Sequence, residues 1–80
     1  MNDIAERNTL ITNHIPNCNK LIGIYCARYP EADKDEVRSI AYYAMVKSAA
    51  RYNQERGIKY WTYAEHIIRN DIYSYIIKLR

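Results

Sequence analysis

The chain has 80 residues and a formal net charge of +3. A chain of this length supports one hydrophobic core, so residues 1–80 are expected to form a single domain. The sequence contains no apolar run of about 18 residues and no basic-then-apolar start of a secretory signal. We therefore expect no membrane contact and a cytoplasmic location.

The charge is divided unevenly along the chain. Residues 1–37 hold four Lys or Arg and six Asp or Glu, a net of −2, whereas residues 38–80 hold eight and three, a net of +5. The C-terminal half is therefore the half suited to phosphate groups. On charge alone, a solvated basic surface without any ligand is an equally good interpretation.

Four helical segments are predicted, and no segment alternates with the period of a strand. Residues 1–16 include a loosely held first helix. Residues 17–29 form the second helix, which ends before Pro30 because proline cannot continue a helix. Its inward face is given by residues at helical spacing: Cys18, Leu21, Ile22, Tyr25, Cys26 and Tyr29.

The third helix is predicted over residues 34–56, from a capping box of Asp33 and Glu36 to a C-terminal Gly57. Its inward residues are Val37, Ile40, Ala41, Ala44, Met45, Ser48, Ala49 and Tyr52. The fourth helix, residues 63–80, follows a second capping box of Thr62 and Glu65. Its inward residues are Ala64, Ile67, Ile68, Ile72, Tyr75, Ile76 and Leu79. The predicted fold class is all-α, a compact domain of three to four helices.

The sequence lacks the patterns of catalytic and metal sites. Cys18 and Cys26 are eight positions apart on one predicted helix, about 12 Å, which is too far for a disulfide. With His14 they match no metal-ligand spacing, so we expect buried small side chains, no metal and no cofactor. Glu65 and His66 are adjacent on a helix and point in different directions, so they make a poor acid–base pair. We expect no catalytic residue and no enzyme.

Aromatic residues gather in one short segment. The chain has nine Tyr, one Trp and no Phe, and Tyr60, Trp61 and Tyr63 lie within four positions. Rings beside cations bind single-stranded DNA, because bases stack on the rings and cations hold the backbone. The alternative is a hydrophobic plug that closes the turn between two helices, and composition alone favours the plug.

The spacing of residue types from Asp33 onward favours the DNA interpretation. The pattern is held by Asp35-Glu36-Val37, Lys47, Tyr52, Asn53 to Arg56, Gly57, Lys59, Tyr60, Thr62-Tyr63-Ala64 and Ile68-Arg69. In this order the residues resemble region two of bacterial RNA polymerase sigma factors, and Gly57 to Arg69 is the most specific stretch. The resemblance implies an all-helical domain that takes part in transcription initiation.

The resemblance also implies a DNA-binding surface for the non-template strand of the −10 promoter element. Tyr60, Thr62 and Tyr63 stand where the family captures a flipped adenine. Asn70 stands where the family often has a Gln that contacts the upstream duplex. The expected DNA-binding residues are Arg56, Lys59, Tyr60, Trp61, Thr62, Tyr63, His66, Arg69 and Asn70.

The second implied partner is core RNA polymerase, through the clamp helices of its largest (beta-prime) subunit. The expected contacts are Asp35, Glu36, Arg38, Ser39, Tyr42 and Tyr43. Two departures from the family stand out. His66 and Ile67 replace the adjacent Trp pair of housekeeping members, and Ser39 replaces a usual Gln. The sequence has no module for the −35 element, so we expect a second protein that reads it.

Two other functions stay open. The first is a sigma-mimicking inhibitor or decoy that occupies polymerase without binding DNA. The second is a small repressor whose last helix enters the major groove of duplex DNA. Its suitable contacts are only Arg69, Asn70 and Lys78, beside two carboxylates, Glu65 and Asp71, that repel phosphate.

Overall fold

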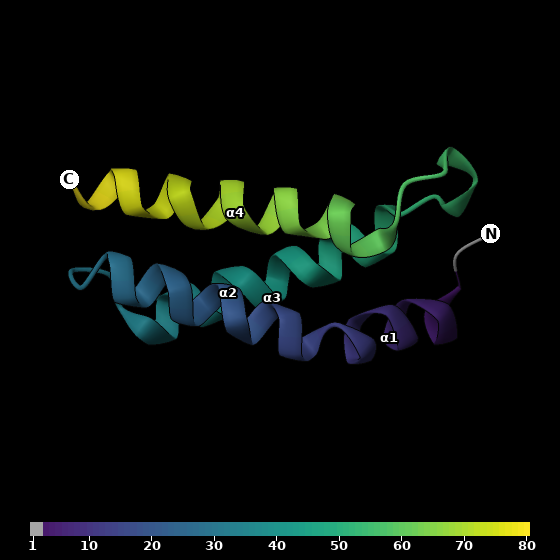
Figure 1. Cartoon of the computed structure of the whole chain (residues 1–80), viewed down its shortest axis with the longest axis horizontal. Helices are drawn as coiled ribbons and strands as arrows, with labels where there is room; N and C mark the ends of the chain where they lie inside the picture. Colours follow the sequence, from purple (N-terminus) through teal and green to yellow (C-terminus); the bar gives the residue numbers. More distant parts are fainter. Residues whose placement is uncertain (1–2) are drawn as a thin grey trace.

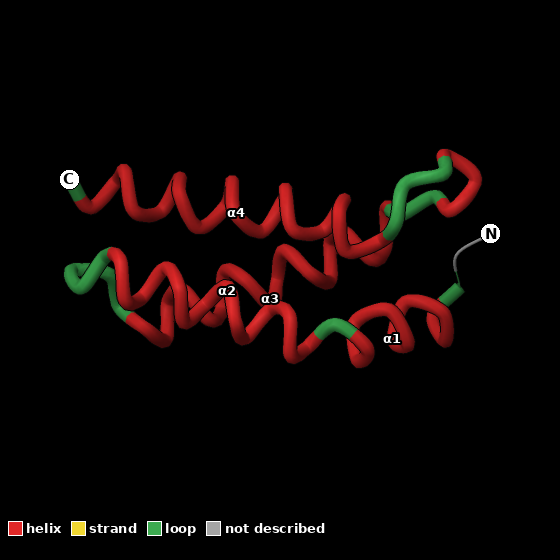
Figure 2. The backbone as a smooth tube through the Cα atoms, viewed as in Figure 1, coloured by secondary structure: helices red, strands yellow, loops and turns green. Residues whose placement is uncertain are grey.

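The computed structural model describes residues 3–80, and this part of the chain is helical (Figure 1). The helices are α1 (Ile4–Asn13), α2 (Ile15–Arg28), α3 (Lys34–Arg51) and α4 (Tyr60–Leu79), with a short 3-10 helix η1 (Gln54–Arg56) before α4. Helices and loops account for all of residues 3–80 in the tube of Figure 2. The all-α prediction is confirmed.

The helices form an elongated body of 40 × 19 × 16 Å. In Figure 1, α1 and α2 make one row, α4 makes the other, and α3 runs between them. Helix α4 packs mainly on α3, which also carries α2 and α1, whereas α2 and α4 meet only along a narrow seam. Helix α3 is therefore the central element of the fold.

The start of α3 is fixed by Asp33, as predicted. The Asp33 carboxylate accepts hydrogen bonds from the backbone N–H groups of Asp35 (2.8 Å) and Glu36 (3.1 Å), which satisfies two free donors of the first turn. The backbone N–H of Asp33 itself donates to the Tyr75 hydroxyl at 3.1 Å. The turn between α2 and α3 is thereby tied to α4, forty-two residues away.

Two predicted boundaries of the long helices were wrong. Helix α3 ends at Arg51 rather than at residue 56, and Gly57, at φ 76°, caps η1 instead of α3. Helix α4 begins at Tyr60, three positions before the predicted start at residue 63, and its N-cap Lys59 makes no side-chain capping bond. The capping box of Thr62 and Glu65 does not exist, because burial of Tyr60 brings the preceding turn of backbone into the helix.

The N-terminal segment forms helix α1, which has no buried residue. Asp3 caps α1 by accepting from the Glu6 N–H at 2.8 Å, and Leu10 and Ile11 pack against the core. The predicted interruption at residues 13–16 is only a bend, since Pro16 lies in the first turn of α2, where a proline is tolerated. Residues 1–2 of the predicted first helix lie outside the described residues.

The core consists of residues from the predicted inward faces, together with Tyr60. Its fully buried apolar residues come from α2, α3 and α4: Cys18, Leu21, Ile22, Val37, Ala41, Ala44, Met45, Ala49, Tyr60, Ala64, Ile68, Ile72 and Ile76. The alanines of α3 allow α4 to approach closely, and Ser48 is buried among them. Leu79 was predicted to face inward but is 46% exposed, because α4 extends past the core at its C-terminal end.

The two cysteines are free thiols, Cys18 buried and Cys26 half-buried. Within residues 3–80, no cluster of three His, Cys, Asp or Glu side chains is arranged to hold a metal ion. None of the helices in this part of the chain has both the length and the apolar character of a membrane span.

The buried thiol predicts a loss of stability at alkaline pH. Burial raises the pKa of Cys18 from 9.0 to about 11. Between these values the unfolded chain releases the proton while the folded chain retains it, so the free energy of unfolding falls as pH rises. Denaturant titrations from pH 9 to pH 11 should therefore show a steeper decline for the parent than for Cys18→Ala.

Cys26→Ala is the matched control and should follow the slope of the parent. Equal slopes for Cys18→Ala and the parent would contradict the prediction.

Candidate nucleic-acid interface

The turn between α3 and α4 is fixed by its own hydrogen bonds. The Tyr52 hydroxyl donates to the Ile58 carbonyl, which closes the loop across its base. The Asn53 side chain accepts from the Glu55 N–H at 2.9 Å and caps η1. Gly57 adopts the left-handed conformation that favours glycine. The segment that presents the aromatic residues is therefore an ordered turn.

Tyr60 lies in the core and is only 4% exposed. Its hydroxyl contacts the Ser48 Oγ at 3.0 Å and donates to the Met45 carbonyl at 3.2 Å. Ser48 also donates to that carbonyl at 2.8 Å. Burial raises the pKa of Tyr60. The predicted contact of Tyr60 with a base is not supported, because the folded chain presents almost none of its ring.

The other rings are linked to Tyr60. Tyr52 meets it edge-on at 5.4 Å between centroids and lies 6.1 Å from Tyr63. His14 meets it edge-on at 5.1 Å and stacks on Trp61 at 5.8 Å, with the two planes 1° apart. Trp61 and Tyr63 are half-buried. They are the two rings of the predicted trio that remain accessible to a base.

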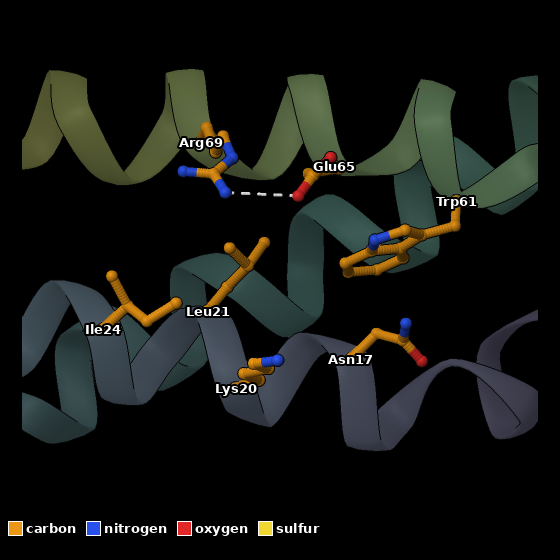
Figure 3. Close-up of a pocket in the computed structure, with 7 residues that line it drawn as sticks. All are labelled: Asn17, Lys20, Leu21, Ile24, Trp61, Glu65 and Arg69. Carbon is orange, nitrogen blue, oxygen red and sulfur yellow. Dashed lines mark hydrogen bonds and ion pairs between the residues drawn. The ribbon is translucent and has the colours of Figure 1, made fainter.

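A groove of about 330 Å³ lies between α2 and α4 (Figure 3). Helix α4 contributes Trp61, Glu65 and Arg69, and α2 contributes Asn17, Lys20, Leu21 and Ile24. In Figure 3 the indole of Trp61 projects from the start of α4 toward α2. The groove thus combines an aromatic ring with two cations and an amide, the side-chain types that hold single-stranded nucleic acid.

The residues of α2 were missed in the sequence. Asn17, Lys20 and Ile24 recur at helical spacing along one edge of the apolar stripe, but nothing local shows that this edge borders α4. The proximity of α2 and α4 is a tertiary property. The only signal of these groove residues in the sequence was Lys20, a positive charge near the amide of Asn17 on the second helix.

Arg69 is held in place at the far end of the groove from Trp61. It donates to the Glu65 carboxylate at 3.2 Å and to the Tyr25 hydroxyl at 3.5 Å, and it lies 5.9 Å from the centre of the Tyr25 ring. Both hydrogen bonds raise the pKa of Arg69, and the bond with Tyr25 has the larger effect. A phosphate that binds Arg69 competes with Glu65 for the guanidinium.

The remaining predicted DNA contacts are exposed. Thr62, His66 and Asn70 follow one another at intervals of four and line one outward side of α4. Arg56 and Lys59 lie on the turn before α4. The structure therefore divides the predicted set into a groove, an outer strip of α4 and a basic turn.

The predicted polymerase contacts divide in a similar way. Asp35, Glu36, Arg38, Ser39 and Tyr43 are exposed on α3. Tyr42 is half-buried, and its hydroxyl donates to Asn19 of α2. Its side chain is therefore engaged in packing α2 on α3.

An exposed strip on α3 was predicted only in part. Ser39, Tyr43, Val46 and Ala50 share the outward side of the helix, and Tyr43 and Val46 are 64% and 51% exposed. Ser39 and Tyr43 were predicted as polymerase contacts, whereas Val46 and Ala50 were not. The signal was Val46, a large apolar residue outside the predicted inward stripe.

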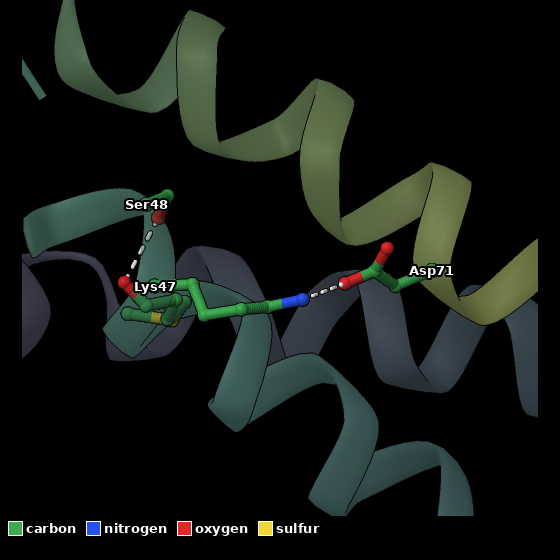
Figure 4. Close-up of polar contacts among 4 residues, drawn as sticks. Lys47, Ser48 and Asp71 are labelled. Atoms are coloured by element: carbon green, nitrogen blue, oxygen red, sulfur yellow. Dashed lines mark hydrogen bonds and ion pairs between the residues drawn. The ribbon is translucent and has the colours of Figure 1, made fainter. Parts of the chain in front are cut away.

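Lys47 connects this side of α3 to α4. Its ammonium forms an ion pair with Asp71 at 2.9 Å (Figure 4). It also lies 4.9 Å from the centre of the Tyr43 ring. Figure 4 also shows Ser48 on the next position of α3, directed toward its own buried hydrogen bond. Lys47 thus makes a half-buried contact and Ser48 a buried one.

Most of the chain matches a protein-family model. The family model Sigma-70 region 2 matches residues 18–80, which span most of α2 and all of α3, η1 and α4. Members of that family are non-enzymatic transcription-factor domains. None of the curated proteins and none of the solved structures matches the chain.

Removal of the buried hydroxyl should destabilise the fold modestly. Tyr60→Phe removes the contacts to Ser48 and the Met45 carbonyl, but Ser48 keeps its own bond to that carbonyl. The substitution leaves no buried donor without an acceptor. The free energy of unfolding, measured by urea denaturation, should therefore fall by about 1 kcal/mol. Tyr73→Phe is the control, at a ring that is 51% exposed, and should leave the free energy of unfolding unchanged. A Tyr60→Phe variant as stable as the parent would refute this account of the hydroxyl.

Proposed function

The chain belongs to the sigma-70 region 2 family, and on this premise we propose that it binds core RNA polymerase and unpaired −10 promoter DNA. The observation that carries the proposal is the placement of two accessible rings, Trp61 and Tyr63, at the start of α4 beside Lys59 and the cations of the groove. Helix α3 would hold the polymerase while the groove and the turn hold the non-template strand.

The DNA contact rests on stacking and charge. Each base that stacks on an aromatic side chain contributes about 1 to 3 kcal/mol, which offsets the cost of unpairing. Of the two tyrosines predicted to capture a base, Tyr63 keeps the stacking role, because its ring is accessible and that of Tyr60 is buried. Thr62 is exposed beside it. Lys20 and Arg69 lie farther along the groove and are suited to the phosphates of the strand that leads away from a base at Trp61.

The outer strip of α4 is suited to the neighbouring duplex. Asn70 offers an amide, which pairs with the edge of adenine, and His66 lies one turn before it. The strip carries no Trp pair at His66 and Ile67, so strand opening depends more on polymerase than on this helix. A second protein that reads the −35 element completes the proposal.

The polymerase contact rests on the exposed strip of α3. An aromatic residue surrounded by smaller apolar groups is the usual centre of a protein interface, and Tyr43 with Val46 provides it. Asp35 and Glu36 lie at the N-terminal end of the strip and favour a partner surface that carries cations. The clamp helices of the beta-prime subunit are the proposed partner.

Core polymerase should retain the chain in a pull-down, and Val46→Glu should weaken this binding about tenfold or more. The substitution places a charge at the centre of the apolar strip, on a side chain that is 51% exposed, so the fold is preserved. Tyr73→Ala, on the exposed side of α4, is the control and should bind as the parent does. If core polymerase does not retain the parent, alone or with a partner protein, the docking proposal is wrong.

The parent should bind a single-stranded −10-like oligonucleotide in preference to the same sequence as duplex, as measured by fluorescence anisotropy with core polymerase present. Tyr63→Ala should reduce this affinity about tenfold, because one stacking surface is lost. Tyr73→Ala again serves as the control.

The outcomes separate the competing functions. Polymerase inhibition that survives Tyr63→Ala, with no strand binding by the parent, identifies the chain as a sigma-mimicking inhibitor. A preference for intact duplex identifies it as a repressor.

A further inference from the structure

The single tryptophan of the chain, Trp61, is the only ring among the groove residues. Its side chain begins at the first turn of α4 and reaches toward α2, as Figure 3 shows. A ring that spans a gap between two helices needs a support, because an unsupported side chain samples several rotamers. The structure provides this support from the bend between α1 and α2.

The support is the imidazole of His14. Its plane lies 1° from that of the Trp61 indole, with 5.8 Å between centroids, and it meets Tyr60 edge-on at 5.1 Å. The parallel, offset arrangement is a favourable geometry for two rings. His14 therefore joins Trp61 to the buried Tyr60 and covers part of one indole face.

The imidazole is itself fixed. Its Nδ1 donates to the Leu10 carbonyl at 2.8 Å, and since a carbonyl only accepts, Nδ1 carries the proton. The backbone N–H of His14 donates to the Ile11 carbonyl at 3.1 Å and closes the end of α1. Both the backbone and the ring of His14 are thus held by the last turn of α1.

We propose that His14 is a positioning residue for single-strand binding, which holds Trp61 so that the free part of the indole faces an unpaired base in the groove. This inference rests on the proposed function. His14 and α1 precede residue 18, where the family match begins, so the family pattern assigns His14 no role. The physical benefit is preorganisation, because a ring already ordered in the free protein loses less entropy on binding.

The first test needs no DNA. Emission reports on Trp61 alone when it is excited at a wavelength that tryptophan absorbs and tyrosine does not, because the chain has one tryptophan beside its nine tyrosines. His14→Ala should increase acrylamide quenching of this emission, whereas His14→Phe, which keeps a flat ring, should leave it close to the parent value. Asn13→Ala, at the exposed neighbouring position, is the control and should have no effect. Unchanged quenching in His14→Ala would overturn the positioning role.

The second test is a double-mutant cycle with the single-stranded oligonucleotide. His14→Ala should weaken binding about fivefold to tenfold, and His14→Phe should restore most of the affinity. In a Trp61→Leu background, His14→Ala should cause no further loss, because the residue acts through Trp61. A full effect of His14→Ala without Trp61, or no effect with it, would overturn the proposal.

The failure of the inference and the failure of the proposed function give different results. If the parent binds no single strand, the proposed function and the DNA role of His14 are both overturned, while the quenching test still shows whether His14 holds Trp61. If Trp61→Leu weakens binding and His14→Ala does not, only the inference fails. Should His14→Ala not fold by circular dichroism, His14→Gln replaces it, because glutamine keeps a donor but has no ring.

Discussion

The contact on which the rest of the structure depends is the buried hydrogen bonding of the Tyr60 hydroxyl with Ser48 and the Met45 carbonyl. It fixes the first residue of α4 against α3, where small side chains leave room for a ring. Successive positions on a helix are rotated by about 100°. Once Tyr60 points inward, Trp61 is directed toward α2 and Tyr63 toward Tyr52, so one buried phenol determines where both accessible rings lie.

The groove exists because α2 and α4 do not close on each other. Their seam is made of rings and ions: Tyr25 and Tyr29 stack on α2, and Arg69 and Arg80 lie over them at 5.9 and 5.3 Å. Each arginine also pairs with a carboxylate, Glu65 or Glu31, on side chains that are substantially exposed. Exposed ion pairs add little stability. The seam therefore sets the position of the two helices, while the stability comes from the apolar contacts of α3.

The parts of this structure that could be predicted are those with a local cause. Asp33 as a helix cap and the inward faces of α2, α3 and α4 follow from side-chain chemistry and from the helical period. Tyr60 was predicted to be accessible but lies in the core. A single ring beside a turn belongs to no helical repeat that would show whether it faces inward or outward. Lys20 and Asn17 were missed because their proximity to Trp61 depends on how α2 lies beside α4. The site is harder to predict than the fold because it is built from contacts between helices.

Helix α3 serves both proposed surfaces, yet with different sides. Its inward side holds Tyr60 and therefore the rings at the start of α4, whereas its outward side carries Tyr43 and Val46. Substitutions on exposed residues of the two surfaces share no contact, so their free energies should add. Substitutions at Ser48 act on the buried side alone and reach the DNA surface through Tyr60. Lys47 is the exception, since it contacts the Tyr43 ring and Asp71 of α4 at once. A substitution of Lys47 is therefore the one whose effect on binding free energy should not add to those of substitutions on the polymerase and DNA surfaces.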